Sequence, residues 1–216
     1  MQVKLVSVTK PVGEGVETLS AEELIVYCAR VSSPQNQDNL ATGPKLLAFL
    51  IRNKHWSPFE LVDMTVEIVT SRAIAAQILR HRSFSFQEFS LRYAESACVF
   101  EPQEARVKGT TNRQSSQEAP EDIVEWWQHA LSTVQDQATD VYKHAIQEGI
   151  APEVARMALP LGVQTRLYMK GSVRSWIHYF ETRTTSHAQK EHRDVALAIQ
   201  AIFALQFPVV SAALAL

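Results

Sequence analysis

The stretch LVDMTVEIVTSRAIAAQILRHRSFSFQEFSLRY, residues 61–93, carries the pattern that decides the fold. Apolar residues stand at every second position from Val62 to Ile68, and the residues between them are polar. This period of two predicts a half-buried strand in an antiparallel sheet. Ser71 follows at an N-cap position, and apolar residues then recur one turn apart, which predicts a helix over 71–82.

The rest of the chain mixes helices and strands without a regular alternation of the two. Ser20 with Glu23, and Ser186 with Gln189, form capping-box signatures before apolar-periodic runs. Such signals predict helices over 20–31, 44–53, 120–149, 152–160, 172–183 and 186–207, and strands over 97–102 and 163–170. The pattern favours an α+β fold with mixed helices around a central antiparallel sheet.

The same pattern predicts a single domain that covers residues 1–216. Residues 102–119 are polar, aperiodic and rich in turn residues, so we expect a mobile loop there.

Composition limits the kind of ligand. The 216 residues are 46% hydrophobic and 20% charged, an ordinary globular balance, and the formal net charge is −2. A broad nucleic-acid surface usually needs a basic domain, so cations gathered in one place indicate a small anionic ligand instead. Two cysteines, no signal-peptide pattern and no apolar run of about 18 residues predict a soluble protein of the cytoplasm.

Familiar cofactor signatures are missing from the sequence. No GxxxxGK motif occurs, and the GEG at Gly13–Gly15 lacks the third glycine of a dinucleotide fingerprint. The histidines follow no zinc-binding spacing, so no metal site is expected.

A cluster of cations follows the helix predicted over 71–82. Arg80, His81 and Arg82 are consecutive, so they cannot share one buried helical face. One interpretation is that they complement the helix dipole and face solvent. Against it stand Glu88, Ser90 and Arg92, at alternate positions just downstream. If extended, they point the same way and form a compact pocket for phosphate.

Further cations and a proline turn lie elsewhere in the chain. Arg174 and His178 are four residues apart on one predicted helix, and Arg183 ends it. Arg156 lies in PEVARMALP, and the segment HWSPFE begins at His55. Each of these features alone is compatible with a surface salt bridge or an ordinary turn.

Taken together, four segments resemble one family. RHRSFSFQEFSLRY resembles the signature of flavin-dependent thymidylate synthases, in which seven residues separate Arg-His-Arg from a serine. HWSPFE, PEVARMALP and SVRSWIHYFETRTTSHAQ resemble the other ligand-binding segments of that family, in the same order.

The resemblance implies the fold of that family and the reductive methylation of dUMP to dTMP. Methylenetetrahydrofolate would be the carbon donor, and FAD reduced by NADPH would be the hydride source. It also implies a homotetramer whose sites are shared between subunits. The net charge and the lack of a long apolar run predict no nucleic-acid or membrane partner.

The resemblance assigns roles to individual residues as well. Arg183 would lie over the uracil, favour its ionised N3 and so raise the nucleophilicity of C5, and His55 would sit against the flavin where folate enters. FAD would contact Ser57, Arg80, His81, Arg82, Glu88, Ser172, Arg174 and His178. The dUMP contacts would be Gln77, Arg80, Glu88, Ser90, the Leu91 backbone, Arg92, Arg183, and Arg156 from another subunit.

Three positions depart from the family pattern. Gln87 and Ser172 stand where asparagine is frequent, and Leu91 stands where glycine is frequent. An alternative function is a non-catalytic nucleotide- or RNA-binding module that uses the same arginines. A homologue that oxidises NADPH without methylating is a further alternative.

Overall fold

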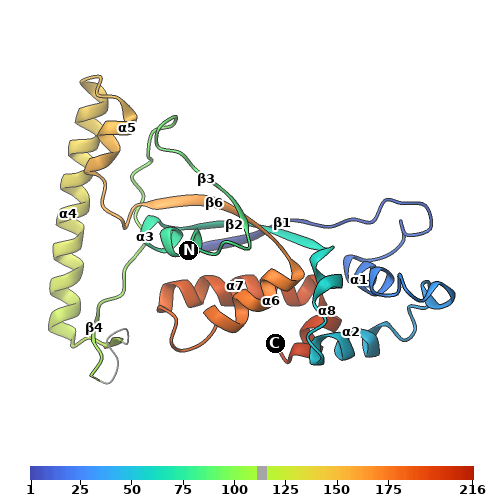
Figure 1. The fold of residues 1–216 in the computed structure, drawn as a ribbon. Coiled ribbons are helices and arrows are strands. Elements are labelled where there is room, and N and C mark those ends of the chain that lie inside the picture. The colour runs from blue at the N-terminus through green and yellow to red at the C-terminus, as the bar shows by residue number, and fades with distance from the viewer. Residues whose placement is uncertain (111–115) are drawn as a thin grey trace. The chain divides into compact units, whose positions relative to one another are not determined.

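Helices and strands alternate irregularly along the chain, which the computed structural model describes over residues 1–110 and 116–216 (Figure 1). The strands are β1 (Gln2–Val8), β2 (Asp63–Ser71), β3 (Ser85–Glu88), β4 (Arg106–Lys108), β5 (Ser116–Glu118) and β6 (Gln164–Ser172). The α-helices are α1 (Ala21–Ala29), α2 (Gly43–Arg52), α3 (Arg72–Ile78), α4 (Glu121–Gln147), α5 (Pro152–Ala155), α6 (Val173–Arg183), α7 (Lys190–Gln206) and α8 (Pro208–Leu214). Short 3-10 helices are η1 (Pro34–Asn36), η2 (Ser57–Glu60) and η3 (Arg156–Ala158).

The central sheet has four strands in the order β1-β2-β6-β3. The β2 and β6 strands run antiparallel, as the hydrogen bonds at both ends of the pair show. The Val173 N–H donates to the Val62 carbonyl at 2.8 Å, and the Arg72 N–H donates to the Val163 carbonyl at 3.0 Å. The prediction of an α+β fold with an antiparallel sheet is therefore confirmed.

The chain divides into two compact units. Unit 1 comprises Met1, Val69–Arg80 and Gln87–Leu167, and unit 2 comprises Gln2–Ile68, His81–Phe86 and Tyr168–Leu216. Strands β2, β3 and β6 each contribute residues to both units. The expectation of a single domain stays a prediction.

A serine at the end of β2 and another at the end of β6 start the helices that follow. The Ser71 side chain accepts from the Ile74 N–H at 3.4 Å, and the Ser172 side chain accepts from the Ser175 N–H at 3.3 Å. Both serines have extended backbone and bond to a free N–H in the first helical turn, as N-caps do. The predicted caps of α3 and α6 are confirmed.

The predicted extension of α3 to Arg82 is wrong, because the helix ends at Ile78. The chain then turns, and the Phe84 N–H donates to the His81 carbonyl at 3.2 Å. Phe84 is buried against Trp176, with ring centroids 4.6 Å apart. Burial of this ring in unit 2 favours the turn over a continued helix.

Unit 1 contains the long helix α4, yellow in Figure 1, close to its predicted bounds. The strand predicted over 97–102 is wrong: only Phe100 makes a β-bridge, and Cys98 has a φ of 52°, outside the strand region. Within the predicted loop 102–119, β4 and β5 pair antiparallel. The loop's mobility stays a prediction, and residues 111–115 lie outside the described part of the chain.

Unit 2 packs α6 and α7 together around aromatic side chains. Trp176 is fully buried, and its indole N–H donates to the Met64 carbonyl at 3.1 Å. The capping box predicted from Ser186 is wrong: α7 begins at Lys190, and its N-cap, Gln189, makes no capping hydrogen bond through its side chain. Strand β1 and helix α8, which the sequence analysis did not predict, also belong to this unit.

No helix in residues 1–110 and 116–216 is both long and apolar enough to span a bilayer.

Gly171 in β6 leaves space for the Phe84 ring. A Cβ at this position would lie 2.4 Å from two carbons of that ring, closer than packed carbons approach. We expect Gly171→Ala to destabilise the protein by about 1–3 kcal/mol, because overpacked cores must shift. Its melting temperature should fall by several degrees, at about 2–4 °C per kcal/mol for a chain of this size.

The matched control is Gly162→Ala, whose added Cβ would have no heavy atom within 4 Å beyond its chain neighbours. Thermal unfolding of both variants checks the packing of Phe84. Equal melting temperatures for the two variants would contradict it.

Candidate functional site

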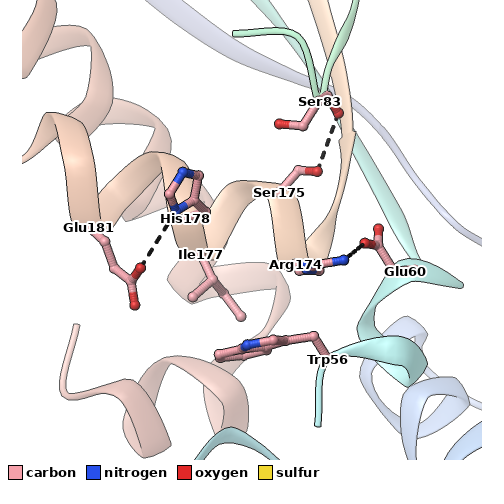
Figure 2. Close-up of a pocket in the computed structure, with 8 residues that line it drawn as sticks. All are labelled: Trp56, Glu60, Ser83, Arg174, Ser175, Ile177, His178 and Glu181. Atoms are coloured by element: carbon pink, nitrogen blue, oxygen red, sulfur yellow. Dashed lines mark hydrogen bonds and ion pairs between the residues drawn. The ribbon is translucent and has the colours of Figure 1, made fainter. Parts of the chain in front are cut away.

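Unit 2 contains a pocket of about 360 Å³ lined by residues of η2 and α6 (Figure 2). Trp56 lies on one side of the pocket, and Glu60, Arg174 and His178 also line it, with Arg174 directed at Glu60. The pocket thus combines an aromatic surface with cations, the chemistry that suits a ring system carrying phosphates.

Glu60 holds two of the predicted ligands in place. Its Oε1 accepts from the Arg174 Nη1 at 2.6 Å, and its Oε2 accepts from the Ser172 hydroxyl. Burial raises the pKa of Glu60, but the hydrogen bonds from Ser172 and Arg174 outweigh burial and hold this pKa below its ordinary value. Glu60 is therefore a carboxylate at neutral pH, and the remaining N–H groups of Arg174 are available to an anion.

Glu60 lies in the predicted segment HWSPFE, but the sequence analysis assigned it no role. The only signal was its carboxylate, two residues after a proline in a short motif. Its partners lie more than a hundred residues away in the sequence, so no local spacing could reveal the clamp.

A second group in unit 2 joins Arg183 to His81. The Arg183 Nε–H donates to the His81 Nε2 at 2.9 Å, which requires that this nitrogen carries no proton. Burial is the largest of the causes that lower the pKa of His81 to about 4, and the charges of Arg183 and His178 add to it. His81 is thus a neutral imidazole that fixes the orientation of the guanidinium at neutral pH.

Behind His81 lie two residues that the sequence analysis did not assign to the site, Tyr179 and His192. His192 is fully buried, its Nε2 lies 3.1 Å from the Tyr179 hydroxyl, and the ring centroids of Tyr179 and His81 are 4.9 Å apart. Burial, Arg183 and His81 lower the pKa of His192 to about 3, and burial raises the pKa of Tyr179 despite the opposing charge of Arg183. Both groups are neutral, so they back the His81 imidazole without adding charge.

The other sequence-predicted residues of unit 2 lie at the surface. His55 is exposed, with its ring 5.9 Å from that of Phe49, and Ser57 begins η2 and is also exposed. These two residues flank Trp56, which lines the pocket. Arg82 is exposed in the turn after His81.

Unit 1 holds most of the residues that the sequence analysis assigned to dUMP. Glu88, at the end of β3, accepts at its Oε1 from the Thr165 hydroxyl at 2.8 Å and from the Arg72 Nη1 at 3.1 Å. Leu91 and Arg156 line a second pocket of about 300 Å³, which Arg72 also lines. Gln77 in α3 is partly buried, and Arg80 beyond it is exposed.

The predicted alternation of Glu88, Ser90 and Arg92 on one extended strand is wrong beyond Glu88. The Ser90 carbonyl accepts from the Tyr93 N–H at 3.3 Å, and the Ser90 hydroxyl accepts from the Arg92 N–H at 3.3 Å. A serine that bonds to a backbone N–H two residues on favours a turn over a strand.

Arg92 and Arg156 meet on one acidic residue instead. The Arg92 Nε donates to the Glu153 carboxylate at 3.2 Å, and the Arg156 Nε donates to the Glu153 carbonyl at 3.2 Å. Arg72, Thr165 and Glu153 had no predicted role in the sequence analysis.

Known proteins of one family are similar to this chain along most of its length. A family model described as "Thymidylate synthase complementing protein" matches residues 16–209. The chain is 56% identical over 217 residues to the flavin-dependent thymidylate synthase of Synechocystis sp., with 99% of each chain covered. The chain belongs to the flavin-dependent thymidylate synthase family.

Other members and a solved structure agree with this family. The probable flavin-dependent thymidylate synthase of Paramecium bursaria Chlorella virus 1 is 51% identical over 215 residues, with 99% of each chain covered. The UMP/dUMP methylase PolB from Streptomyces cacaoi, solved with 5-Br dUMP, superposes with a TM-score of 0.84 at 26% identity. That match covers 98% of this chain and 93% of PolB. The resemblance to the flavin-dependent thymidylate synthase family is confirmed.

The lowered pKa values of His81 and His192 predict how stability depends on pH. The unfolded chain binds these protons near pH 6.5, whereas the folded chain resists them down to about pH 4 and about pH 3. The contribution to stability is therefore full above about pH 6.5 and is lost as the pH falls, toward about 4 for His81 and toward about 3 for His192. We expect the melting temperature to drop across this window.

His192→Gln isolates the effect, because glutamine can bond to the Tyr179 hydroxyl but does not titrate. Its melting temperature should fall less steeply with decreasing pH than that of the unmodified protein. The control is His129→Gln on the exposed side of α4, which should keep the original slope. Melting curves at several pH values measure this slope. An unchanged slope in His192→Gln would contradict the lowered pKa of His192.

Proposed function

We propose that the protein methylates dUMP to dTMP with FAD as its flavin, methylenetetrahydrofolate as carbon donor and NADPH as reductant. The observation that carries the proposal is the 2.9 Å hydrogen bond between Arg183 and His81. These are the residues that the family resemblance assigns to the uracil and to the flavin. One direct bond therefore joins the two groups whose ligands must react with each other.

The pocket of unit 2 suits FAD. Arg174 keeps about half of its side chain exposed (53%) while Glu60 holds it, and His178 is more exposed still. Such cations suit the diphosphate, and the Trp56 indole suits a flat ring. We assign FAD to Ser57, Arg80, His81, Arg82, Glu88, Ser172, Arg174 and His178. When bound and reduced, FAD supplies the hydride for the methyl group.

The cations of unit 1 suit the nucleotide. Arg92 and Arg156 each direct a guanidinium beside Glu153, and a phosphate could bind to their remaining N–H groups. Glu88 is an acceptor for a ribose hydroxyl or a base N–H. We assign dUMP to these residues together with Gln77, Arg80, Ser90, Leu91 and Arg183.

Arg183 is the proposed catalytic cation. Its Nε–H is committed to His81, so the two Nη groups are those that face the substrate. A fixed guanidinium stabilises negative charge that develops on the uracil ring and so raises the nucleophilicity of C5. His55 is the second catalytic assignment, and we place it where folate approaches the flavin.

We also propose a homotetramer with shared sites. Apolar side chains exposed on unit 1 support it, since a monomer rarely exposes many such groups together. Those on α4 are Trp126, Val134 and Val141, and those after it are Val154, Met157 and Leu161. Light scattering that shows an active monomer would contradict this assembly.

An anaerobic assay for dTMP tests the proposed function. The protein should convert dUMP to dTMP only when FAD, methylenetetrahydrofolate and NADPH are all present. Arg183→Ala should lower this rate by about a hundredfold or more, the usual cost of a lost charged contact to a developing anion. Reduction of the bound FAD by NADPH should stay close to the original rate in this variant.

Two results would contradict these assignments. Absence of dTMP under all conditions, with flavin bound, would refute the methylation. Equal loss of dTMP formation and of FAD reduction by NADPH in Arg183→Ala would indicate a structural role for the arginine. A colourless protein that binds RNA would instead favour the binding-module alternative.

Ser90 should be a ligand and not a nucleophile. Its hydroxyl accepts from the Arg92 N–H, and no histidine or carboxylate of the described residues lies within hydrogen-bond distance to take its proton. We expect Ser90→Ala to raise the dUMP requirement by about 1.5–3 kcal/mol, the value of a hydrogen bond to a charged group. Turnover at saturating dUMP should remain measurable.

Steady-state kinetics with varied dUMP check this prediction, and Ser90→Cys serves as the matched variant that should also retain activity. The ligand assignment fails if Ser90→Ala binds dUMP and FAD yet gives no dTMP at any dUMP concentration. It also fails if an adduct between Ser90 and uracil is trapped.

A further inference from the structure

Arg72 is the first residue of α3 and has no role in the assignments above. Its backbone N–H donates to the Val163 carbonyl at 3.0 Å, so the end of the β2–β6 pair fixes its position. Its side chain is 23% exposed and lines the pocket of about 300 Å³ together with Leu91 and Arg156. Arg72 thus lies beside residues that we assign to dUMP.

The guanidinium of Arg72 bonds to the last residue of β3 and to the residue that follows it. Its Nη1 donates to the Glu88 Oε1 at 3.1 Å, and its Nη2 donates to the Phe89 carbonyl at 3.1 Å. The two bonds come from the two arms of one planar fork, which is rigid. Arg72 therefore fixes the Glu88 carboxylate and also the direction in which the chain leaves toward Ser90.

Thr165 completes the hold on Glu88. Its hydroxyl donates to the same Oε1 at 2.8 Å, and Thr165 itself is buried in β6. The Glu88 Oε1 is thus committed to two donors. Within residues 1–110 and 116–216, the Glu88 Oε2 accepts no hydrogen bond, so it is the oxygen left for a ligand.

We propose that Arg72, together with Thr165, is a positioning residue that presents the Glu88 Oε2 to a hydroxyl or N–H donor of the bound nucleotide. The inference rests on the proposed function for the identity of that nucleotide. The ion pair also offsets the charge of Glu88 beside a site that must accept an anionic phosphate. Arg72 acts through Glu88 and needs no contact with dUMP of its own.

An ordinary salt bridge would explain the Arg72–Glu88 contact differently. A salt bridge that only stabilises the fold would have no effect on ligand affinity through Glu88. The two explanations differ in coupling: a positioning role requires that the effect of Arg72 on dUMP binding depends on Glu88. A double-mutant cycle measures that dependence directly.

The experiment measures the dUMP dissociation constant by calorimetry, with the full-length FAD-loaded protein. Arg72→Ala and Glu88→Gln should each weaken dUMP binding by about tenfold or more, as expected for a lost hydrogen bond to a charged group. The double variant should bind about as weakly as either single variant. Where turnover is measured for Arg72→Ala, the KM for dUMP should rise while kcat at saturation changes little.

Two conservative pairs guard against misfolding. Thr165→Val should weaken dUMP binding severalfold, whereas Thr165→Ser, which keeps the hydroxyl, should bind almost normally. Arg72→Lys can replace only one of the two arms, so its affinity should lie between those of the unmodified protein and Arg72→Ala. Flavin absorbance should be the same in the Arg72 and Thr165 variants, neither of which we assign to FAD.

The outcomes separate the inference from the proposed function. Additive losses in the double variant, or normal dUMP binding by Thr165→Val, would overturn the positioning role. A protein that binds dUMP but makes no dTMP would refute the proposed function while the cycle still decides the role of Arg72. A protein that does not bind dUMP would overturn both.

Discussion

The antiparallel pairing of β2 with β6 is the constraint on which the rest of the structure depends. Hydrogen bonds close the pair at both ends, Arg72 with Val163 in unit 1 and Val62 with Val173 in unit 2. Each strand ends in a serine that caps a helix, so the sheet fixes where α3 and α6 begin. The cations that follow are placed by backbone geometry and not by long flexible loops, which reduces the entropy lost on binding an anion.

Burial sets the charge of the two histidines beside Arg183 in unit 2. His81 and His192 are held neutral because their environment opposes protonation, and a neutral His81 can accept the Arg183 N–H. If His81 were charged, two cations would oppose each other where negative charge must be stabilised. The carboxylate of Glu60 performs the complementary task, since it holds Arg174 without neutralising the whole pocket.

Periodicity and caps predicted much of this architecture from the sequence alone. The alternation in β2, the caps at Ser71 and Ser172 and the long helix α4 are local patterns, and all three are present. The turn at Ser90 was missed because a side chain competes with the strand for backbone N–H groups. Partners of Glu60, about 110 residues distant, could not be inferred from spacing. The family motifs supplied ligand names, but only the fold revealed the bond from Arg183 to His81.

A crystal structure with FAD and 5-bromo-dUMP tests the central claim most directly, because the anomalous signal of bromine locates C5 of the uracil. The account predicts that the flavin ring lies against His81, that the bromine lies beside the Arg183 guanidinium, and that the nucleotide phosphate lies at Arg92 or Arg156. Bromine remote from Arg183, or FAD bound away from Arg174 and His81, would contradict it.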